Sequence, residues 1–170
     1  MSQLHQMQCS FVPEEDRIMF RMNTRNRQEF RFWMTRRYVD LLWTTISNVV
    51  EQKEAPQARD ELKKSATIQD KHEKTVEKSD FKTQYQESTY LPMGKEPLLL
   101  FSVGVKKSPE GKAILCMHPK SGEGIELAMN DQIVHSLCKL LIDSSEKAKW
   151  GLNLNWTKSH NTQVPKQGLN

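Results

Sequence analysis

Two stretches near the start of the chain alternate between apolar and polar residues, which is typical of β-strands with one buried face. The stretches are residues 17–23 and 28–34, and the polar sequence TRNR lies between them. We therefore predict a β-hairpin with one apolar face. That face would carry Ile18, Phe20, Met22, Phe30, Phe32 and Met34.

A helix is predicted directly after the hairpin. Thr35 is a good N-cap, because its hydroxyl can accept a hydrogen bond from a free amide of the first turn. Apolar residues then recur at helical spacing from Val39 through about Val50, so this helix would lie with its apolar stripe on the hairpin. Alternating apolar residues ahead of Pro13 also predict a leading strand.

The same order of elements is predicted again in the second half of the chain. When the sequence is shifted by 95 residues, Arg17–Ile46 lies over Lys112–Leu141 without a gap, and most apolar positions coincide. The capping Thr35 then falls on Asn130, another favoured N-cap. A leading strand at Leu98–Lys107 precedes this second block. The pattern predicts a duplicated β-β-β-α unit, although two units that share only a binary pattern of apolar and polar residues would look the same.

A long charged segment separates the two units. Residues 51–87 are rich in Lys, Glu, Asp, Gln and Thr, and their few large apolar side chains do not fall on one helical stripe. Such a segment buries too little apolar surface to offset the entropy lost on ordering, so we expect a solvated helix or a mobile linker.

We therefore predict an α+β protein with antiparallel sheets and with helices packed on one face. The two units are expected to share one domain. The parts are a first β-β-β-α unit at residues 1–53, a charged linker, helical or disordered, at 54–95, a second unit at 96–156 and a disordered tail at 157–170.

Composition and the absence of targeting patterns say more about the cellular compartment than about the function. The 170 residues are only 36% hydrophobic and carry a formal net charge of +4, which permits a nucleic-acid partner without requiring one. The three cysteines are widely spaced and form no CxxC pair. The first residues lack the pattern of a secretory signal, and no apolar run is long enough to span a membrane. We expect a reduced, cytoplasmic setting with no membrane association.

The sequence contains no catalytic signature of the phosphate-loop, dinucleotide-binding, nucleophile-elbow or zinc-protease type. Ser121–Gly124 is interpreted as a tight turn between two strands. Cys116 and His118 share a strand face, but two ligands do not make a metal site. His135 is expected at the surface of the second helix. We therefore expect no metal, no cofactor and no catalytic residue, although an enzyme with a site assembled from dispersed residues stays open.

Arginine supplies the positive signal for binding. Seven arginines of the first unit lie on the strand faces away from the core, in the turn between the strands and in the first turn of the helix. Trp33 is predicted on the same strand face as Arg31, and guanidinium groups beside an indole suit the phosphates and bases of a single strand. The second unit weakens this hypothesis, because Glu126 stands where Arg31 does. The candidate nucleic-acid or anion-binding residues are Arg17, Arg21, Arg25, Arg27, Arg31, Trp33, Arg36 and Arg37.

The same sheet face is partly apolar in both units, which supports a different interpretation. Met19 and Trp33 meet Ile114 and Ala128 under the shift, and Cys116 lies on the same face as Ile114. Such a face is commonly covered by the linker, the sister unit or a second copy. Our leading hypothesis is a non-enzymatic binding or assembly module that acts through an apolar sheet face, with a homo-oligomer or a protein partner. Its interface would contain Met19, Trp33, Ile114 and Cys116; the alternative is a single-stranded nucleic-acid-binding protein that uses Arg17, Arg21, Arg31 and Trp33.

Two segments, EFRFWMTRRYVDLLW and the later DQIVHSLCKLL, resemble a family of small uncharacterised bacterial proteins with a repeated strand-strand-helix unit. The resemblance implies a bacterial cytoplasmic protein and brings no activity with it. At the level of fold, paired strand-rich units that each end in a helix are similar to Whirly and PUR-type nucleic-acid-binding proteins. Those repeats have four strands each, whereas three are predicted here, so the likeness is an analogy.

Overall fold

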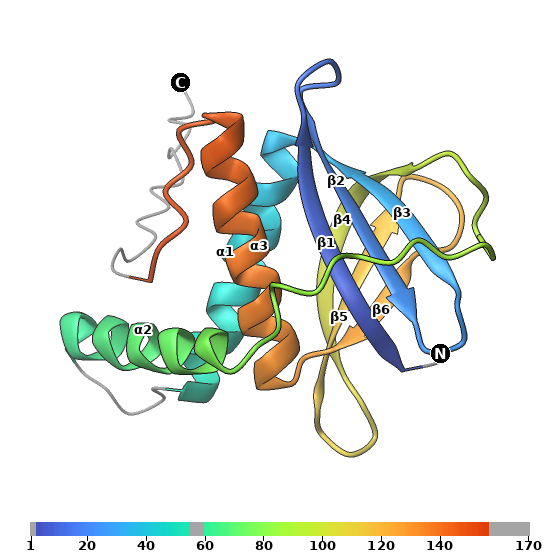
Figure 1. Cartoon of the computed structure of the whole chain (residues 1–170). Helices are drawn as coiled ribbons and strands as arrows, with labels where there is room; N and C mark the ends of the chain where they lie inside the picture. The colour runs from blue at the N-terminus through green and yellow to red at the C-terminus, as the bar shows by residue number, and fades with distance from the viewer. Residues whose placement is uncertain (1–2, 55–59, 157–170) are drawn as a thin grey trace, which may run out of the picture.

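The computed structural model describes residues 3–54 and 60–156. These residues form one six-stranded mixed sheet and three helices, so the predicted α+β class is confirmed (Figure 1). The predicted tail at 157–170 lies outside the described residues. The elements in chain order are β1 (Leu4–Val12), β2 (Arg17–Thr24), β3 (Glu29–Met34), α1 (Arg36–Glu54), α2 (Glu61–Glu77), β4 (Leu98–Lys107), β5 (Ala113–Pro119), β6 (Ile125–Ala128) and α3 (Asp131–Ala148).

The strands lie in the sheet in the order in which they occur in the chain. β1, β2 and β3 form one antiparallel meander, and β4, β5 and β6 form another. The two meanders join through a short parallel pairing, in which Phe32 lies opposite Leu98 and Trp33 opposite Leu99. The prediction of antiparallel sheets is therefore correct within each meander and wrong at the junction.

Both principal helices begin where their capping residues predict. The Thr35 hydroxyl accepts a hydrogen bond from the Tyr38 amide at 3.2 Å, at the start of α1. The Asn130 side chain accepts one from the Ile133 amide at 2.9 Å, at the start of α3. Each cap satisfies an amide that has no partner within its helix.

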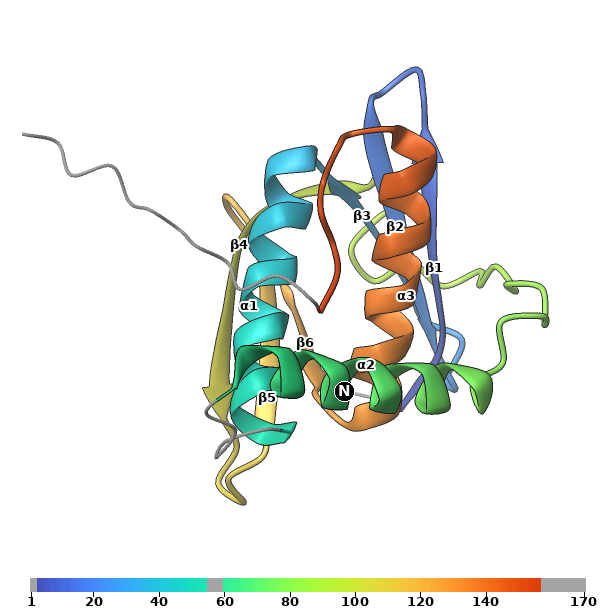
Figure 2. The ribbon, with the colours of Figure 1, turned by 90° about the vertical axis from the view of Figure 1, so that its left-hand side faces the viewer.

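The core lies between the sheet and the layer formed by α1 and α3 (Figures 1 and 2). Ile18, Phe20 and Met22 face this layer and are fully buried, as their alternation predicts. The main chain of α1 comes nearest to β4, and that of α3 nearest to β1 and β2. Each helix therefore lies nearest to strands of the other half, which differs from the predicted packing of the first helix on its own hairpin.

α2 crosses α1 and α3 on the side away from the sheet (Figure 2). About half of its described side chains are exposed, whereas Ile68 and His72 are buried. The Nδ1 atoms of His72 and His135 are 3.0 Å apart, and the Trp156 ring lies against both imidazoles. The expectation of a surface His135 is wrong, because α2 and the Trp156 ring cover it and leave 1% of it exposed.

Beyond α2 the chain continues as an extended segment that crosses β1, β2 and β3 on the face opposite the helices (Figure 1). We call this segment, residues 78–97, the strap. It differs from the expected mobile linker, because side chains of the sheet bind its main chain.

The buried histidine pair predicts a pH dependence of stability. Burial lowers the pKa of His135 to about 4, the proximity of His72 adds to this shift, and burial also lowers the pKa of His72. The unfolded chain, with histidine pKa values near 6.5, then binds more protons than the folded chain below neutral pH. We expect the free energy of unfolding to fall by about 1–2 kcal/mol between pH 7.5 and 5.

Urea denaturation at several pH values measures this dependence. A His72→Gln/His135→Gln variant should lose most of it, because it removes both buried imidazoles, whereas His5→Gln, at an exposed position, should retain it. An unchanged dependence in the double variant would assign the effect to other groups.

Gly124, in the turn between β5 and β6, should not tolerate a larger side chain. A Cβ atom at Gly124 would lie 2.1 Å from the Met117 carbonyl oxygen, so Gly124→Ala should force the main chain to shift. We expect a loss of about 1–3 kcal/mol in the free energy of unfolding. Gly104→Ala is the matched control, because no described atom lies within 4 Å of its added Cβ; equal losses in both variants would contradict this account.

Candidate functional site

The face of the sheet opposite the helices, here called the outer face, carries three rows of side chains that cross β1, β2 and β3. They follow from the register, because residues paired across neighbouring strands point to the same side of a sheet. The polar row contains Gln6, Asn23 and Glu29, and the arginine row contains Gln8, Arg21 and Arg31. The apolar row contains Met19, Trp33 and Leu99 of β4, with Ser10 at its β1 end.

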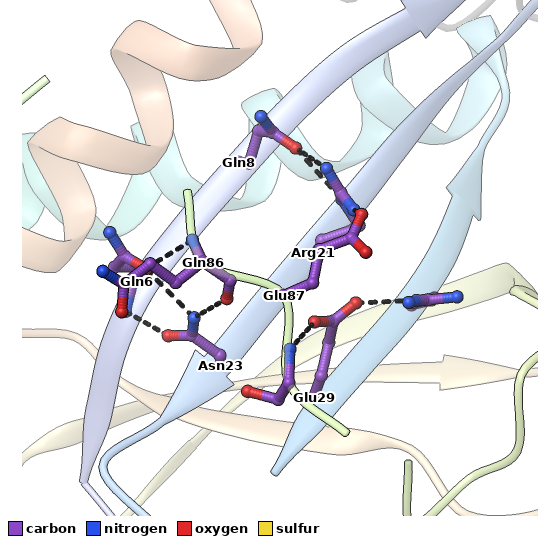
Figure 3. Close-up of polar contacts among 9 residues, drawn as sticks. Gln6, Gln8, Arg21, Asn23, Glu29, Gln86 and Glu87 are labelled. Atoms are coloured by element: carbon purple, nitrogen blue, oxygen red, sulfur yellow. Dashed lines mark hydrogen bonds and ion pairs between the residues drawn. The ribbon is translucent and has the colours of Figure 1, made fainter. Parts of the chain in front are cut away.

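The polar row holds the main chain of the strap (Figure 3). The Asn23 amide donates to the Gln86 carbonyl at 2.8 Å, and the Gln86 amide donates to Gln6 Oε1 at 3.0 Å. At the next alternate residue, the Ser88 amide donates to Glu29 Oε2 at 2.7 Å. Asn23 and Glu29 are almost fully buried beneath the strap, so these hydrogen bonds satisfy groups that would otherwise be costly to bury.

The arginine row is held by carboxylates and by an aromatic ring. Arg21 donates to Glu87 of the strap at 2.6 Å, and its guanidinium lies 4.7 Å from the centre of the Tyr85 ring. Arg31 donates to Glu29 Oε1 at 2.7 Å. Arg21 lowers the pKa of Glu87, and the hydrogen bond to Glu29 raises the pKa of Arg31. Each arginine thus faces a carboxylate, and this part of the outer face is close to electrically neutral.

Beside the strap the apolar row opens into a shallow hollow of about 450 Å³. Met19 and Trp33 line it together with Arg21 and Arg31, and Lys95 of the strap stands at its rim. Lys95 forms no ion pair with the described residues. The hollow therefore combines an indole, a thioether, cationic groups and the Glu87 carboxylate in one place open to solvent.

The apolar row continues toward the second meander. Leu99 is 42% exposed and Phe101, in an irregular part of β4, is 52% exposed. Ile114 and Cys116 lie on the same face of β5, where Lys106 and Glu126 form an ion pair at 2.5 Å. The predicted interface residues therefore share one face, but only Met19 and Trp33 lie in the hollow.

The predicted arginines do not form one cluster. Arg21 and Arg31 lie together, whereas Arg17 is at the far end of β2 and 3.8 Å from Glu15. Arg25 and Arg27 lie at the turn between β2 and β3, beside a second hollow of about 450 Å³. Arg36 and Arg37 are on the helix side, and Arg36 donates to the Trp150 carbonyl at 2.9 Å.

Sequence reasoning missed the partners that the strap supplies. Tyr85, Glu87 and Lys95 lie in the segment that the sequence predicts to be a linker, and the residues of the polar row are not among the predicted site residues. One signal was available, because Glu29 is the lone acidic residue among the arginines of the hairpin. A single carboxylate in such a setting indicates a specific partner, and the structure gives it Arg31 and the Ser88 amide.

In residues 3–54 and 60–156, no three His, Cys, Asp or Glu side chains gather as they would around a metal ion. None of the helices in these ranges has the length and apolar character needed to cross a membrane.

Searches against protein-family models, curated proteins and solved structures found no match for this chain.

Because Glu29 is buried, its removal should strongly lower the free energy of unfolding. Glu29→Ala would leave the Arg31 guanidinium and the Ser88 amide without their acceptor, and we expect the free energy of unfolding to fall by about 2–4 kcal/mol. Glu15→Ala is the control, because Glu15 makes an exposed ion pair with Arg17 and should cost less than about 0.5 kcal/mol. Urea denaturation compares the two variants, and similar small losses would show that Glu29 does not hold this face together.

Proposed function

We propose that the protein is a non-enzymatic binding module that acts through the outer face of its sheet, with a second copy of the chain as its partner. The observation that carries this proposal is the apolar row. Met19, Trp33 and Leu99 lie side by side on three neighbouring strands. Met19 and Trp33 are half-buried, Leu99 is exposed, and exposed Phe101 follows two residues later on β4. Contiguous apolar surface of this kind on a folded protein is typical of an interface.

The charges beside the row favour association with a like surface. Arg21 and Arg31 face Glu87 and Glu29, so two outer faces could approach each other without strong repulsion. Aromatic residues and arginine are also enriched at the centres of protein interfaces. These features support a protein partner, and a second copy needs no other component.

A second candidate function is the binding of single-stranded nucleic acid. Arg21, Arg31 and Lys95 line the same hollow as Trp33, and this combination suits a phosphate beside a stacked base. A nucleic acid would have to compete with Glu87 for Arg21, so its binding would be weakened by the strap.

We further propose that the two halves arose by duplication of one β-β-β-α unit and that the protein functions in a reducing compartment such as the cytoplasm. The 95-residue shift carries the start of α1 at Arg36 onto the start of α3 at Asp131, and it lays β2 over β5. The three cysteines are free thiols, as is usual in such a compartment.

Sedimentation equilibrium over a range of protein concentrations tests self-association. We expect a mass that rises above the 19.8 kDa of one chain, and a dissociation constant at least about tenfold higher in Leu99→Ser. Leu41→Ser is the matched control, because Leu41 is similarly exposed but lies on α1. A constant mass of one chain at all concentrations would reject the second copy as partner.

Fluorescence anisotropy of labelled single-stranded DNA and RNA tests the second candidate. Binding that weakens steeply with salt and is lost in an Arg21→Ala/Arg31→Ala variant would make nucleic-acid binding the favoured function. The folded state of this variant is checked by circular dichroism. Absence of binding at micromolar protein would remove this candidate.

A further inference from the structure

We propose that the polar row is a binding site for an extended peptide with an aromatic–x–acidic pattern, and that residues 84–88 of the strap occupy this site within the chain. The proposal rests on the proposed function, because it assigns the chemistry of a second partner to the same outer face. It concerns a different row from the one proposed for self-association.

The polar row recognises main-chain groups rather than a particular side chain. The bonds from Gln6, Asn23 and Glu29 reach the strap at residues 84, 86 and 88, which is the repeat of an extended chain. They include both carbonyl oxygens and amide hydrogens of the strap. Any extended peptide offers the same groups at the same spacing, as in other modes of peptide recognition that use main-chain hydrogen bonds.

The arginine row supplies the selectivity for side chains. Tyr85 and Glu87 occupy the intervening positions of the strap, and both meet Arg21, one through its ring and the other through its carboxylate. An aromatic residue and an acidic residue two positions apart therefore match this guanidinium in shape and charge.

The acceptors in the polar row favour a peptide over a nucleic acid. Glu29 Oε2 and Gln6 Oε1 each accept a hydrogen bond from a main-chain amide of the strap. A phosphodiester backbone has no such amide, and its negative charge would lie beside the Glu29 carboxylate. A bound peptide satisfies both acceptors.

The strap is held by contacts that an incoming peptide can replace. Residues 84–88 contribute no side chain to the core, since residues 84, 86 and 87 are exposed and Tyr85 and Ser88 are half-buried. Exchange of one extended chain for another would preserve the hydrogen bonds of buried Asn23 and Glu29. The site can thus change its occupant without leaving buried polar groups unsatisfied.

The test weakens the strap and supplies its sequence as a separate peptide. A Gln86→Pro/Ser88→Pro variant removes the two amide donors to the polar row. The probe is a fluorescently labelled peptide of sequence TQYQESTY, which copies residues 83–90. We expect this variant to bind the probe at least about tenfold more tightly than the unmodified protein, because the internal competitor is lost.

Three controls connect binding to the row. Thr89→Pro leaves both amide donors in place and should bind no better than the unmodified protein. A probe with alanine in place of Tyr85 and Glu87 should bind about tenfold more weakly or worse. Adding Arg21→Ala to the double-proline variant should abolish binding, with circular dichroism and a thermal melt confirming that each variant is folded.

Failure of the folded double-proline variant to bind the probe at about 1 mM would overturn the inference. Binding that is insensitive to Arg21→Ala, or preference for an oligothymidine over the peptide, would overturn it as well. Any of these results together with Leu99-dependent self-association would reject this inference alone. Loss of self-association with peptide binding retained would instead reject the second copy as partner.

Discussion

The parallel pairing of β3 with β4 is the constraint on which the rest of the structure depends. Two parallel neighbours cannot be joined by a tight turn, because the chain must return from the end of the first strand to the start of the second. Residues 35–97 make this return. The connection begins on the helix side as α1 and α2 and ends on the outer face as the strap (Figure 1). The charged segment between the halves is therefore the crossover that the sheet requires.

The crossover also explains why the two halves form one core. α1 lies against β4, where the Tyr38 hydroxyl donates to the Ser102 carbonyl at 3.2 Å. α3 lies against β1. The helices run antiparallel, since Arg36 at the start of α1 meets the Trp150 carbonyl beyond the end of α3. The main chain of each helix lies nearest to strands of the other half, so the apolar faces of the two halves are buried in one shared core.

The sequence predicted the features that depend on local patterns. Alternation located β2 and β3, the helical period located α1 and α3, and Thr35 and Asn130 marked the helix starts. Alternation also placed Arg21, Arg31 and Trp33 on one face. The parallel junction, the histidine pair and the strap could not be found in this way. Each depends on segments far apart in the sequence, and the strap is held through main-chain groups that every residue possesses.

The strap has one further consequence, which concerns the connectivity of the chain. It is the only described link between the helix side and the start of β4, yet its residues contribute little to the core, and most of them are exposed. The two meanders are held together by the shared apolar layer and by the β3–β4 pairing. A break in the strap would therefore leave two fragments that remain associated as one folded body. An intact strap keeps the outer face covered, whereas the packing of the shared core keeps the protein folded.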